Sequence, residues 1–470
     1  MNFTIKSCSI VALLGAALLP LSANAASLNG ADLSLLWALP FAGILLSIAL
    51  GPLFFAHIWH HHYGKIAFAW ALACAIPLVG VYGFESAAPA LSHAILGDYV
   101  PFIIFVGSLF VVAGGIHIRS SFEGTPLMNA AILLVGAFFA NIMGTTGAAM
   151  LLIRPLIKAN ENRRYRIHTF IFFIFLVANI GGCLTPLGDP PLFLGFLRGV
   201  EFFWTFEHLI VPMLVITGIL LAVYIALDTV LYKKEGAHQL AKPESVPFAI
   251  EGKINFLFLA VIVGAVLMSG MWKSGIEYHF AGIHFQLQDL CRDALMLTMG
   301  ACSLAFTPKA ARAANEFTWE PIKEVAKLFF GIFTCIVPVI VMLRAGHEGA
   351  FAPLVALVTH ADGTLNNHMF FWLTGGLSSF LDNAPTYLAF FNLAGGDVNF
   401  LMNEGAHTLM SISMGAVFMG AMSYIGNAPN FMTVAIVQER GIAMPSFFGY
   451  MLWSVGILVP VFFLINMLFL

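Results

Sequence analysis

Long apolar segments recur along almost the whole chain of 470 residues, and they limit the possible folds more than any other feature. A helix needs about 20 apolar residues to cross the hydrocarbon core of a bilayer. Hydrophobic residues make up 60% of the chain and charged residues only 10%, so no stretch is polar enough to form a separate soluble domain. The sequence therefore predicts an all-α polytopic membrane protein. Ten full crossings are expected, at residues 33–54, 66–86, 99–118, 168–200, 208–231, 254–272, 291–307, 326–344, 408–438 and 446–470.

Residues 1–25 have the features of a secretory signal peptide. Lys6 is followed by an apolar stretch from Ile10 to Leu21, and then by the small residues Ala23, Asn24 and Ala25. A first transmembrane helix is the alternative, but this apolar stretch is short. Cleavage after Ala25 predicts a mature N-terminus outside the cytoplasm and a location in a bacterial inner membrane.

Basic residues gather in alternate loops. If the first crossing starts outside, the cytoplasmic loops hold most of the 21 Lys and Arg residues, including those at 154–166 and 233–253. The outer loops at 345–366 and 394–407 contain acidic residues and no Lys or Arg. This distribution agrees with the positive-inside rule.

Five crossings fall in each half of the chain. Because five is odd, the two halves have opposite orientations in the membrane, an arrangement common in secondary transporters. We therefore divide the chain into a signal peptide at 1–25, a first inverted repeat at 26–232, a cytoplasmic linker at 233–253 and a second inverted repeat at 254–470.

Two apolar segments, 127–157 and 367–393, contain a polar motif near their middle. Asn141–Gly147 lies in the first segment and Asp382–Thr386 in the second. Each arm of the first segment has about 14 residues and reaches about 21 Å at 1.5 Å per residue, too short to span a bilayer. Both segments are therefore predicted to be re-entrant hairpins with the motif at the tip.

Two full crossings are interrupted by a second kind of motif. Thr185–Pro191 lies within 168–200, and Tyr424–Asn430 lies within 408–438. Their prolines cannot continue an α-helix, so each crossing is predicted to be a broken helix. The sequence Gly188-Asp189-Pro190-Pro191 aligns with Gly426-Asn427-Ala428-Pro429, and hairpin and break follow in the same order in each half.

The four motifs predict one central ion site. Unwound backbone at membrane depth is tolerated only when it is buried in protein or lines a wet cavity. An acid there costs about 2.5–3.5 kcal/mol, which makes Asp189 and Asp382 functional candidates, although Asp382 could instead cap a helix. We expect Na⁺ to bind carboxylate, amide and hydroxyl oxygens, with Asp189 or Asp382 accepting the proton. The predicted ligands are Asn141, Thr145, Thr146, Asn179, Thr185, Asp189, Asp382, Asn383, Thr386, Asn427 and Asn430.

At these motifs the chain resembles the ion transporter superfamily, which includes NhaD-type Na⁺/H⁺ antiporters, arsenite transporters, and citrate and dicarboxylate transporters. Residues 179–189 and 381–385 are similar to NhaD-type patterns, and the chain is most similar to a bacterial citrate-transport family. The resemblance spans roughly residues 33–470. It implies a scaffold domain, a mobile transport domain that holds the hairpins, homodimers and elevator-like movement.

Two substrate classes remain open. The dicarboxylate symporters of this superfamily carry neutral Ser-Asn-Thr motifs at both hairpins, whereas this chain has Asp382 in the second. Acids in the site would repel a carboxylate unless Na⁺ or H⁺ screened them, which favours Na⁺/H⁺ antiport. Citrate or other di- or tricarboxylate transport coupled to Na⁺ or H⁺ is the alternative. No cofactor is expected beyond these ions, and no basic patch suggests nucleic acid.

An enzyme and a channel are the rival classes. His57, His60, His61 and His62 form a box like those that bind iron in membrane desaturases, but the sequence has no second box. We expect this segment to be a solvated loop at the lipid headgroups. Paired hairpin tips favour an occluded site over the continuous pore of a channel. Arg154 and Asp228, near helix ends, are expected to face the interface.

Overall fold

The computed structural model describes residues 28–236, 246–280 and 283–470, so the predicted signal peptide lies outside the described part. Within the described residues, eight helical segments are long and apolar enough to cross a membrane by length and composition alone. They are Leu35–Phe54, Ala56–Tyr82, Phe84–Ala113, Pro126–Ala159, Trp204–Lys234, Ile254–Met271, Glu320–Arg344 and Phe447–Phe469. The chain is therefore a polytopic, mainly helical membrane protein, as predicted.

The first half is a succession of helices with one short strand. Its elements are α2 (Leu39–Phe54), α3 (Ala56–Tyr82), α4 (Phe84–Ser92), the π-helix η3 (His93–Tyr99), α5 (Val100–Ala113), β1 (His117–Arg119), α6 (Pro126–Ala159), α7 (Ile167–Leu176), η4 (Ile180–Cys183), α8 (Pro190–Leu197) and α9 (Trp204–Lys234). Two short 3₁₀ turns, η1 (Gly30–Asp32) and η2 (Leu35–Ala38), precede α2.

The second half is likewise mainly helical, with short strands and turns between the helices. It contains β2 (Ala249–Glu251), α10 (Ile254–Met271), β3 (Glu277–Phe280), β4 (Ile283–Gln286), α11 (Leu287–Phe306), α12 (Lys309–Ala314), α13 (Glu320–Arg344), η6 (Gly346–Glu348), α14 (Ala352–Leu357), α15 (Asn367–Ser378), α16 (Asn383–Leu393), α17 (Val398–Met402), α18 (Ala406–Met419), η7 (Gly420–Met422), α19 (Ala428–Glu439) and α20 (Phe447–Phe469).

The described residues also include two pairs of short strands among the helices. β1 pairs antiparallel with β2, so that a loop of the first half is joined to the predicted linker through the pair His117 and Glu251. β3 pairs antiparallel with β4 in a short hairpin between α10 and α11. Each strand has only three or four residues, too few to produce a recognisable alternation of polar and apolar side chains.

Two predicted crossings begin too late in the chain. α3 starts at Ala56 and not at 66, and the third crossing starts at Phe84 and not at 99. The expected loop at His57–His62 is thus helical, with Trp59 buried against Gly51 of α2. Histidines near the end of a helix do not interrupt its backbone hydrogen bonds. The polar composition of this segment therefore gave the wrong start for the helix.

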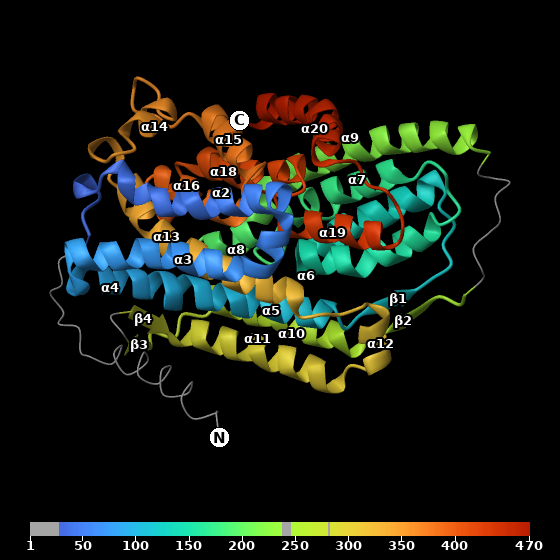
Figure 1. Ribbon diagram of the computed structural model, residues 1–470, viewed down its shortest axis with the longest axis horizontal. Helices are drawn as coiled ribbons and strands as arrows, with labels where there is room; N and C mark the ends of the chain where they lie inside the picture. The colour runs from blue at the N-terminus through green and yellow to red at the C-terminus, as the bar shows by residue number, and fades with distance from the viewer. Residues whose placement is uncertain (1–27, 237–245, 281–282) are drawn as a thin grey trace.

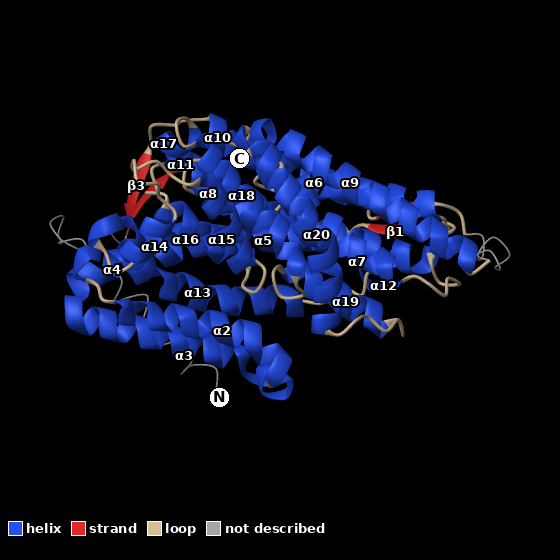
Figure 2. Cartoon of the chain, turned by 90° about the horizontal axis from the view of Figure 1, so that it is seen from above, coloured by secondary structure: helices blue, strands red, loops and turns tan. Residues whose placement is uncertain are grey.

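The long helices run in roughly one direction, with their loops at the two ends of the molecule. Figures 1 and 2 show β1, β2 and α12 at one end, and β3, β4 and α14 at the other. The first group belongs to loops predicted to be cytoplasmic and the second to loops predicted to lie outside. This separation is what the predicted topology requires.

Apolar side chains cover the outside of the molecule, while polar side chains are concentrated within it. Leu452 and Met467 of α20 are 78% and 80% exposed, and large apolar residues are also exposed on α2, α3, α6, α9, α10 and α11. Such a surface suits lipid and would aggregate in water. Many Asn, Ser and Thr side chains are fully buried, and most of them lie near the hairpins and helix breaks.

Candidate functional site

The helix α6 reverses direction at Gly144 and forms the first hairpin. Gly144 has φ 78° and ψ 154°, a conformation that only glycine adopts without strain. At the base of the hairpin, the Asn129 amide donates to Asn160 Oδ1 at 2.9 Å. Farther up, Gly136 lies directly against Leu152. The two arms therefore lie side by side, and Thr145 begins the second arm.

The second hairpin consists of α15 and α16. The rings of Phe370 and Phe390 lie 6.3 Å apart, so the two arms are adjacent. Asp382 is the N-cap of α16, where its Oδ1 accepts a hydrogen bond from the Ala384 N–H at 3.1 Å. The Thr386 hydroxyl donates to the Asp382 carbonyl at 3.0 Å. Asp382 therefore holds the start of a helix, which is the alternative role that its sequence context left open.

Both predicted helix breaks are present, and both depend on a pair of glycines in close approach. A Cβ on Gly188 would lie 2.1 Å from the Gly182 carbonyl oxygen, and a Cβ on Gly426 would lie 2.5 Å from that of Gly420. The two pairs are separated by the same number of residues (426 − 188 = 238 and 420 − 182 = 238). No larger residue fits at these contacts without a backbone shift.

The residues that follow these glycines have matching backbones. Asp189 has φ −143° and ψ 143°, and Asn427 has φ −153° and ψ 142°. Each is the N-cap of the next helix, α8 or α19, which opens with proline in its first turn. Proline suits that position because the first N–H groups of a helix have no partner within the helix.

The hairpin tips are fastened to the breaks by hydroxyl groups in equivalent places. The Thr185 hydroxyl donates to the Asn141 carbonyl at 2.5 Å, and the Ser423 hydroxyl donates to the Ser379 carbonyl at 2.5 Å. These pairs too are 238 residues apart (423 − 185 and 379 − 141). The sequence analysis missed Ser379 and Ser423, although adding this spacing to Asn141 and Thr185 would have identified both.

The Asp189 carboxylate lies where both hairpins and both breaks meet. Its Oδ1 atom accepts hydrogen bonds from the Thr145 hydroxyl at 2.9 Å and the Asn427 amide at 3.1 Å. Its Oδ2 atom accepts one from the Asn383 amide. These four side chains are 0–2% exposed. Buried carboxylates require such donors, and here each donor comes from a different motif.

A second pair of amides lies next to this cluster. The Asn179 amide donates to Asn430 Oδ1 at 2.7 Å, and the Asn430 amide donates to the carbonyls of Gly420 and Ser423. The oxygen atoms Asn179 Oδ1 and Asn383 Oδ1 are buried and have no hydrogen-bond partner among the described residues. Unpaired buried oxygens of this kind are suitable ligands for a hard cation.

The remaining predicted ligands have other contacts. Asn141 and Thr185 fasten the first hairpin tip, since the Leu184 N–H also donates to Asn141 Oδ1 at 2.8 Å. Asp382 and Thr386 hold the start of α16. Thr146 is half-buried next to the tip. The structure thus brings Thr145, Asp189, Asn383 and Asn427 into direct contact and arranges the others around them.

Four helix N-termini point toward the cluster. The second arm of α6 begins at Thr145, α8 at Pro190, α16 at Asn383 and α19 at Ala428. Each N-terminus carries a partial positive charge, so together they stabilise an anion. The Asp189 carboxylate is one such anion, and a carboxylate of a transported molecule is another.

A cavity lies away from this cluster. It has a volume of about 440 Å³ and lies between the second arm of α6, α12 and the end of α19. Arg154 contributes to its wall, and Nε and Nη1 of this side chain are buried without a partner among the described residues. Arg154 also pairs with Glu316 at 3.2 Å. The lining residues are His117, Arg154, Ile157, Lys158, Glu161, Arg166, Ala314, Arg440 and Ile442.

The family described as "Putative citrate transport" matches the chain over residues 30–470. The chain belongs to this family. No curated protein matches it. Membership in the citrate-transport family indicates a transporter, and the match includes both hairpins and both breaks.

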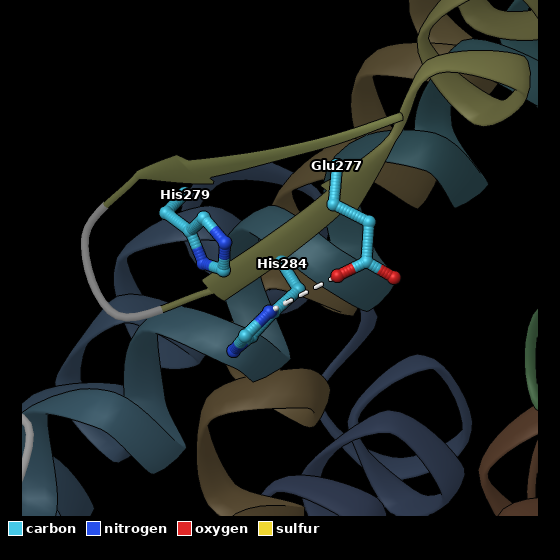
Figure 3. Close-up of side chains that lie close together, drawn as sticks. All are labelled: Glu277, His279 and His284. Carbon is cyan, nitrogen blue, oxygen red and sulfur yellow. Dashed lines mark ion pairs between the residues drawn. The ribbon is translucent and has the colours of Figure 1, made fainter. Parts of the chain in front are cut away.

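The histidine box of this citrate-transport family member lies on the exposed side of α3. The His61 ring nitrogen contacts the His57 carbonyl at 2.9 Å, a contact within one helical turn. A different group of side chains is close enough to share a metal ion, namely Glu277, His279 and His284 on β3 and β4 (Figure 3).

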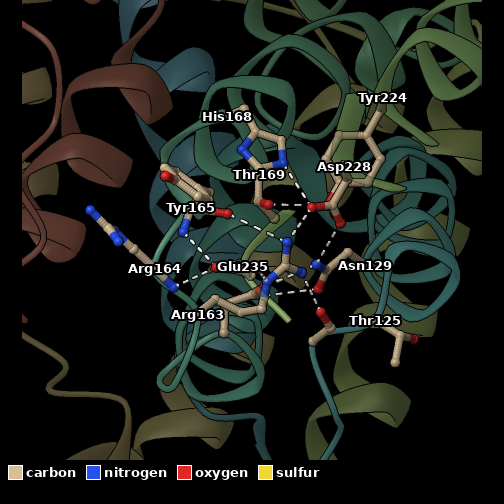
Figure 4. Close-up of polar contacts among 12 residues, drawn as sticks. Thr125, Asn129, Arg163, Arg164, Tyr165, His168, Thr169, Tyr224, Asp228 and Glu235 are labelled. Atoms are coloured by element: carbon tan, nitrogen blue, oxygen red, sulfur yellow. Dashed lines mark hydrogen bonds and ion pairs between the residues drawn. The ribbon is translucent and has the colours of Figure 1, made fainter. Parts of the chain in front are cut away.

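A buried ionic network fixes the base of the first hairpin (Figure 4). Arg163 donates to Asp228 at 2.6 Å, to Glu235, and to the Gly124 carbonyl at 2.5 Å. His168 contacts Asp228 at 2.9 Å. Burial alone would lower the pKa of Arg163, but the hydrogen bonds and charges of Asp228 and Glu235 outweigh burial and raise that pKa. Asp228 is fully buried here and not at the interface, contrary to prediction.

Proposed function

We propose that the protein is a secondary active transporter in which Asp189 exchanges a proton for Na⁺, that is, a Na⁺/H⁺ antiporter. The observation that carries the proposal is the contact of Asp189 with Thr145, Asn383 and Asn427, one residue from each of the other motifs. Because this carboxylate is hydrogen-bonded to both hairpins, a movement of either hairpin changes its hydrogen bonds. Binding at this residue can therefore be coupled to movement of the hairpins.

The exchange requires oxygen atoms to replace the amide donors. As arranged, the Asn383 and Asn427 amides donate to Asp189. A half-turn of the Asn383 amide would present Oδ1, which now has no partner among the described residues, to an ion beside the carboxylate. Protonated Asp189 carries no charge to attract the ion, so the proton leaves as Na⁺ enters. This competition produces antiport at one site.

Alternating access follows if residues 26–232 and 254–470 are inverted repeats. The matched contacts at a spacing of 238 residues support two equivalent units, and the positive-inside rule supports their opposite orientation. We expect the two hairpins to move together with α8 and α19 against the remaining helices. We also expect a homodimer in a bacterial inner membrane, which the mass of the purified protein in detergent would test.

Proteoliposomes containing the purified protein test the antiport proposal. An inward Na⁺ gradient should drive protons out of wild-type vesicles, and Asp189→Asn should abolish this movement. The matched control is the exchange variant Asp189→Asn/Asn427→Asp, which moves the carboxylate to the equivalent position of the second half. Partial recovery in the exchange variant is expected. Unchanged antiport in Asp189→Asn would overturn the proposal.

Citrate or another di- or tricarboxylate is the second candidate substrate. The family description names citrate, and the four helix N-termini would stabilise a bound carboxylate. The 440 Å³ cavity offers further support, because four basic residues and one acidic residue line it. Na⁺ or H⁺ bound at Asp189 would then screen its charge from the substrate.

Labelled citrate separates the two candidates. If citrate is transported, its uptake should require a Na⁺ or H⁺ gradient, and Arg154→Gln should raise its KM about tenfold by removing a buried charge from the cavity. Lys323→Gln, which removes an exposed charge outside the cavity, is the matched control. Proton movement driven by Na⁺ in the absence of citrate, with no citrate uptake, would leave antiport as the function.

A further inference from the structure

The hairpin of β3 and β4 carries two histidines and a glutamate that the transport mechanism does not use. Figure 3 shows Glu277, His279 and His284 with their side chains close together on the strand pair. Their ligand atoms all lie within 4.8 Å of one another. The hairpin connects α10 with α11 and lies with the loops predicted to be outside (Figure 1).

The strand register explains why these three side chains share a face. His279 is directly opposite His284 in the antiparallel pair, so their side chains project to the same side. Glu277 is two residues before His279 on the same strand, and side chains alternate with a period of two. The arrangement therefore follows from the backbone and does not depend on chance side-chain positions.

The chemistry and spacing fit a transition metal. We propose that Glu277, His279 and His284 bind Zn²⁺ or a similar divalent ion through two imidazoles and one carboxylate, with water in the fourth position. Two ligands of a tetrahedral zinc site are about 3.4 Å apart, given bonds of about 2.0–2.1 Å. His284 Nδ1 lies 3.5 Å from Glu277 Oε2, close to that separation.

The third ligand needs only a side-chain rotation. The rings of His279 and His284 have their centroids 4.3 Å apart at an interplanar angle of 75°. All three residues are exposed, so the His279 imidazole can change rotamer without displacing packed neighbours. A metal bound here would link β3 to β4 and thereby fix the connection between α10 and α11.

This site is independent of the proposed ion site. Glu277, His279 and His284 belong to none of the four motifs, and Na⁺ prefers oxygen ligands where zinc prefers imidazole. Zinc binding should consequently persist in the Asp189→Asn variant, which loses antiport. Failure of one proposal therefore leaves the other intact.

Metal titration of the full-length protein tests the site. Protein purified in detergent and treated with chelator would be titrated with Zn²⁺ by calorimetry and with Co²⁺ by absorption, which detects tetrahedral coordination. We expect His279→Ala and His284→Ala each to weaken Zn²⁺ binding at least tenfold and to remove the Co²⁺ spectrum. His347→Ala and His360→Ala, in loops on the same side, are matched controls expected to bind as the wild type does.

The histidines of α3 are the competing source of bound metal. A His57→Ala/His61→Ala variant measures that contribution, because these rings lie one turn apart on an exposed helix. Loss of zinc only in the α3 variant would overturn the proposal. So would wild-type affinity in a His279→Ala/His284→Ala variant that elutes as a folded protein.

Discussion

Asp189 combines a buried carboxyl group with hydrogen bonds from the Thr145 hydroxyl and from the Asn383 and Asn427 amides. Hydrogen bonds to charged groups contribute about 1.5–3 kcal/mol each, more than bonds between neutral groups. Asp382, by contrast, accepts a backbone hydrogen bond and caps a helix. The two acids of the predicted site therefore have different surroundings, and substitutions can separate their roles.

Thr145→Val should weaken ion exchange while keeping the shape of the side chain. Loss of one hydrogen bond to Asp189 corresponds to about a 10- to 100-fold change in the apparent affinity for Na⁺ or H⁺. The Na⁺ dependence of proton movement in proteoliposomes measures this change. Thr145→Ser retains the hydroxyl and should behave nearly as the wild type does. Equal behaviour of the Val and Ser variants would show that the Thr145 contact has no role in transport.

Asp382→Asn should keep the cap of α16 but remove the charge, since Asn and Asp are similar N-caps. Thermal stability should be unchanged, whereas Asp382→Ala should lose about 1 kcal/mol. If Asp382 carries the transported proton, both variants lose antiport. If Asp382 only caps the helix, the Asp382→Asn variant keeps its antiport activity. Antiport assays and melting curves of both variants distinguish the two roles.

Among the elements, the two broken helices depend most directly on residue type. Proline in the first turn of α8 and α19 prevents the preceding helix from continuing, and the glycine pairs allow the backbone to fold back. The freed backbone groups are satisfied by hairpin tips, as when the Thr145 N–H donates to the Gly188 carbonyl at 2.8 Å. Hairpin and break consequently form one structural unit in each half.

Gly188→Ala should disrupt this unit. The added Cβ would lie 2.1 Å from the Gly182 carbonyl oxygen, a contact that requires a backbone shift next to Asp189. We expect loss of transport and a lower melting temperature. Gly218→Ala in α9 is the control, because its Cβ has no atom within 4 Å in the described structure. A fully active Gly188→Ala variant would show that the break tolerates movement.

The base of the first hairpin should be a main source of stability. Asp228→Ala removes one partner of a buried ion pair and leaves Arg163 partly uncompensated, which costs about 3–5 kcal/mol. Thermal unfolding in detergent should therefore begin at a clearly lower temperature. Glu251→Gln, which removes the half-exposed partner of Arg119, should have little effect. Similar melting of both variants would rule out a structural role for the network.

At the scale of the whole molecule, the loops divide into two groups at opposite ends (Figures 1 and 2). This division agrees with the positive-inside rule and with opposite orientations of the two halves. An inverted repeat would place the two hairpins so that they enter from opposite faces. The orientation is open to a direct test.

Cysteine labelling tests which loops face the outside of the membrane and which face the cytoplasm. In a variant without native cysteines, Asn403→Cys should react with a membrane-impermeant maleimide added to intact cells freed of the outer membrane. Ala313→Cys should react only after the membrane is opened. Both residues are exposed in the structure, so lack of reaction would not reflect burial. The opposite labelling pattern would contradict the predicted topology.

Local chemistry determined much of this protein from sequence alone. The lengths of apolar segments predicted the helices, and prolines and glycines predicted the breaks at Thr185–Pro191 and Tyr424–Asn430, because both effects act within a few residues. The same reasoning named Asp189 and Asp382 as the acids of one candidate ion site. It missed the short strands and the early start of α3, since neither has a strong local signal.

Only the tertiary structure decided which polar groups meet. Asp189 contacts Asn383 and Asn427, residues about 200 positions farther along the chain, and that contact depends on how the two halves pack. The same packing buried Asp228 against Arg163 and left Thr146 beside the cluster. A sequence pattern shows which residues are costly to bury in a membrane, but their partners are determined by the packing of distant helices.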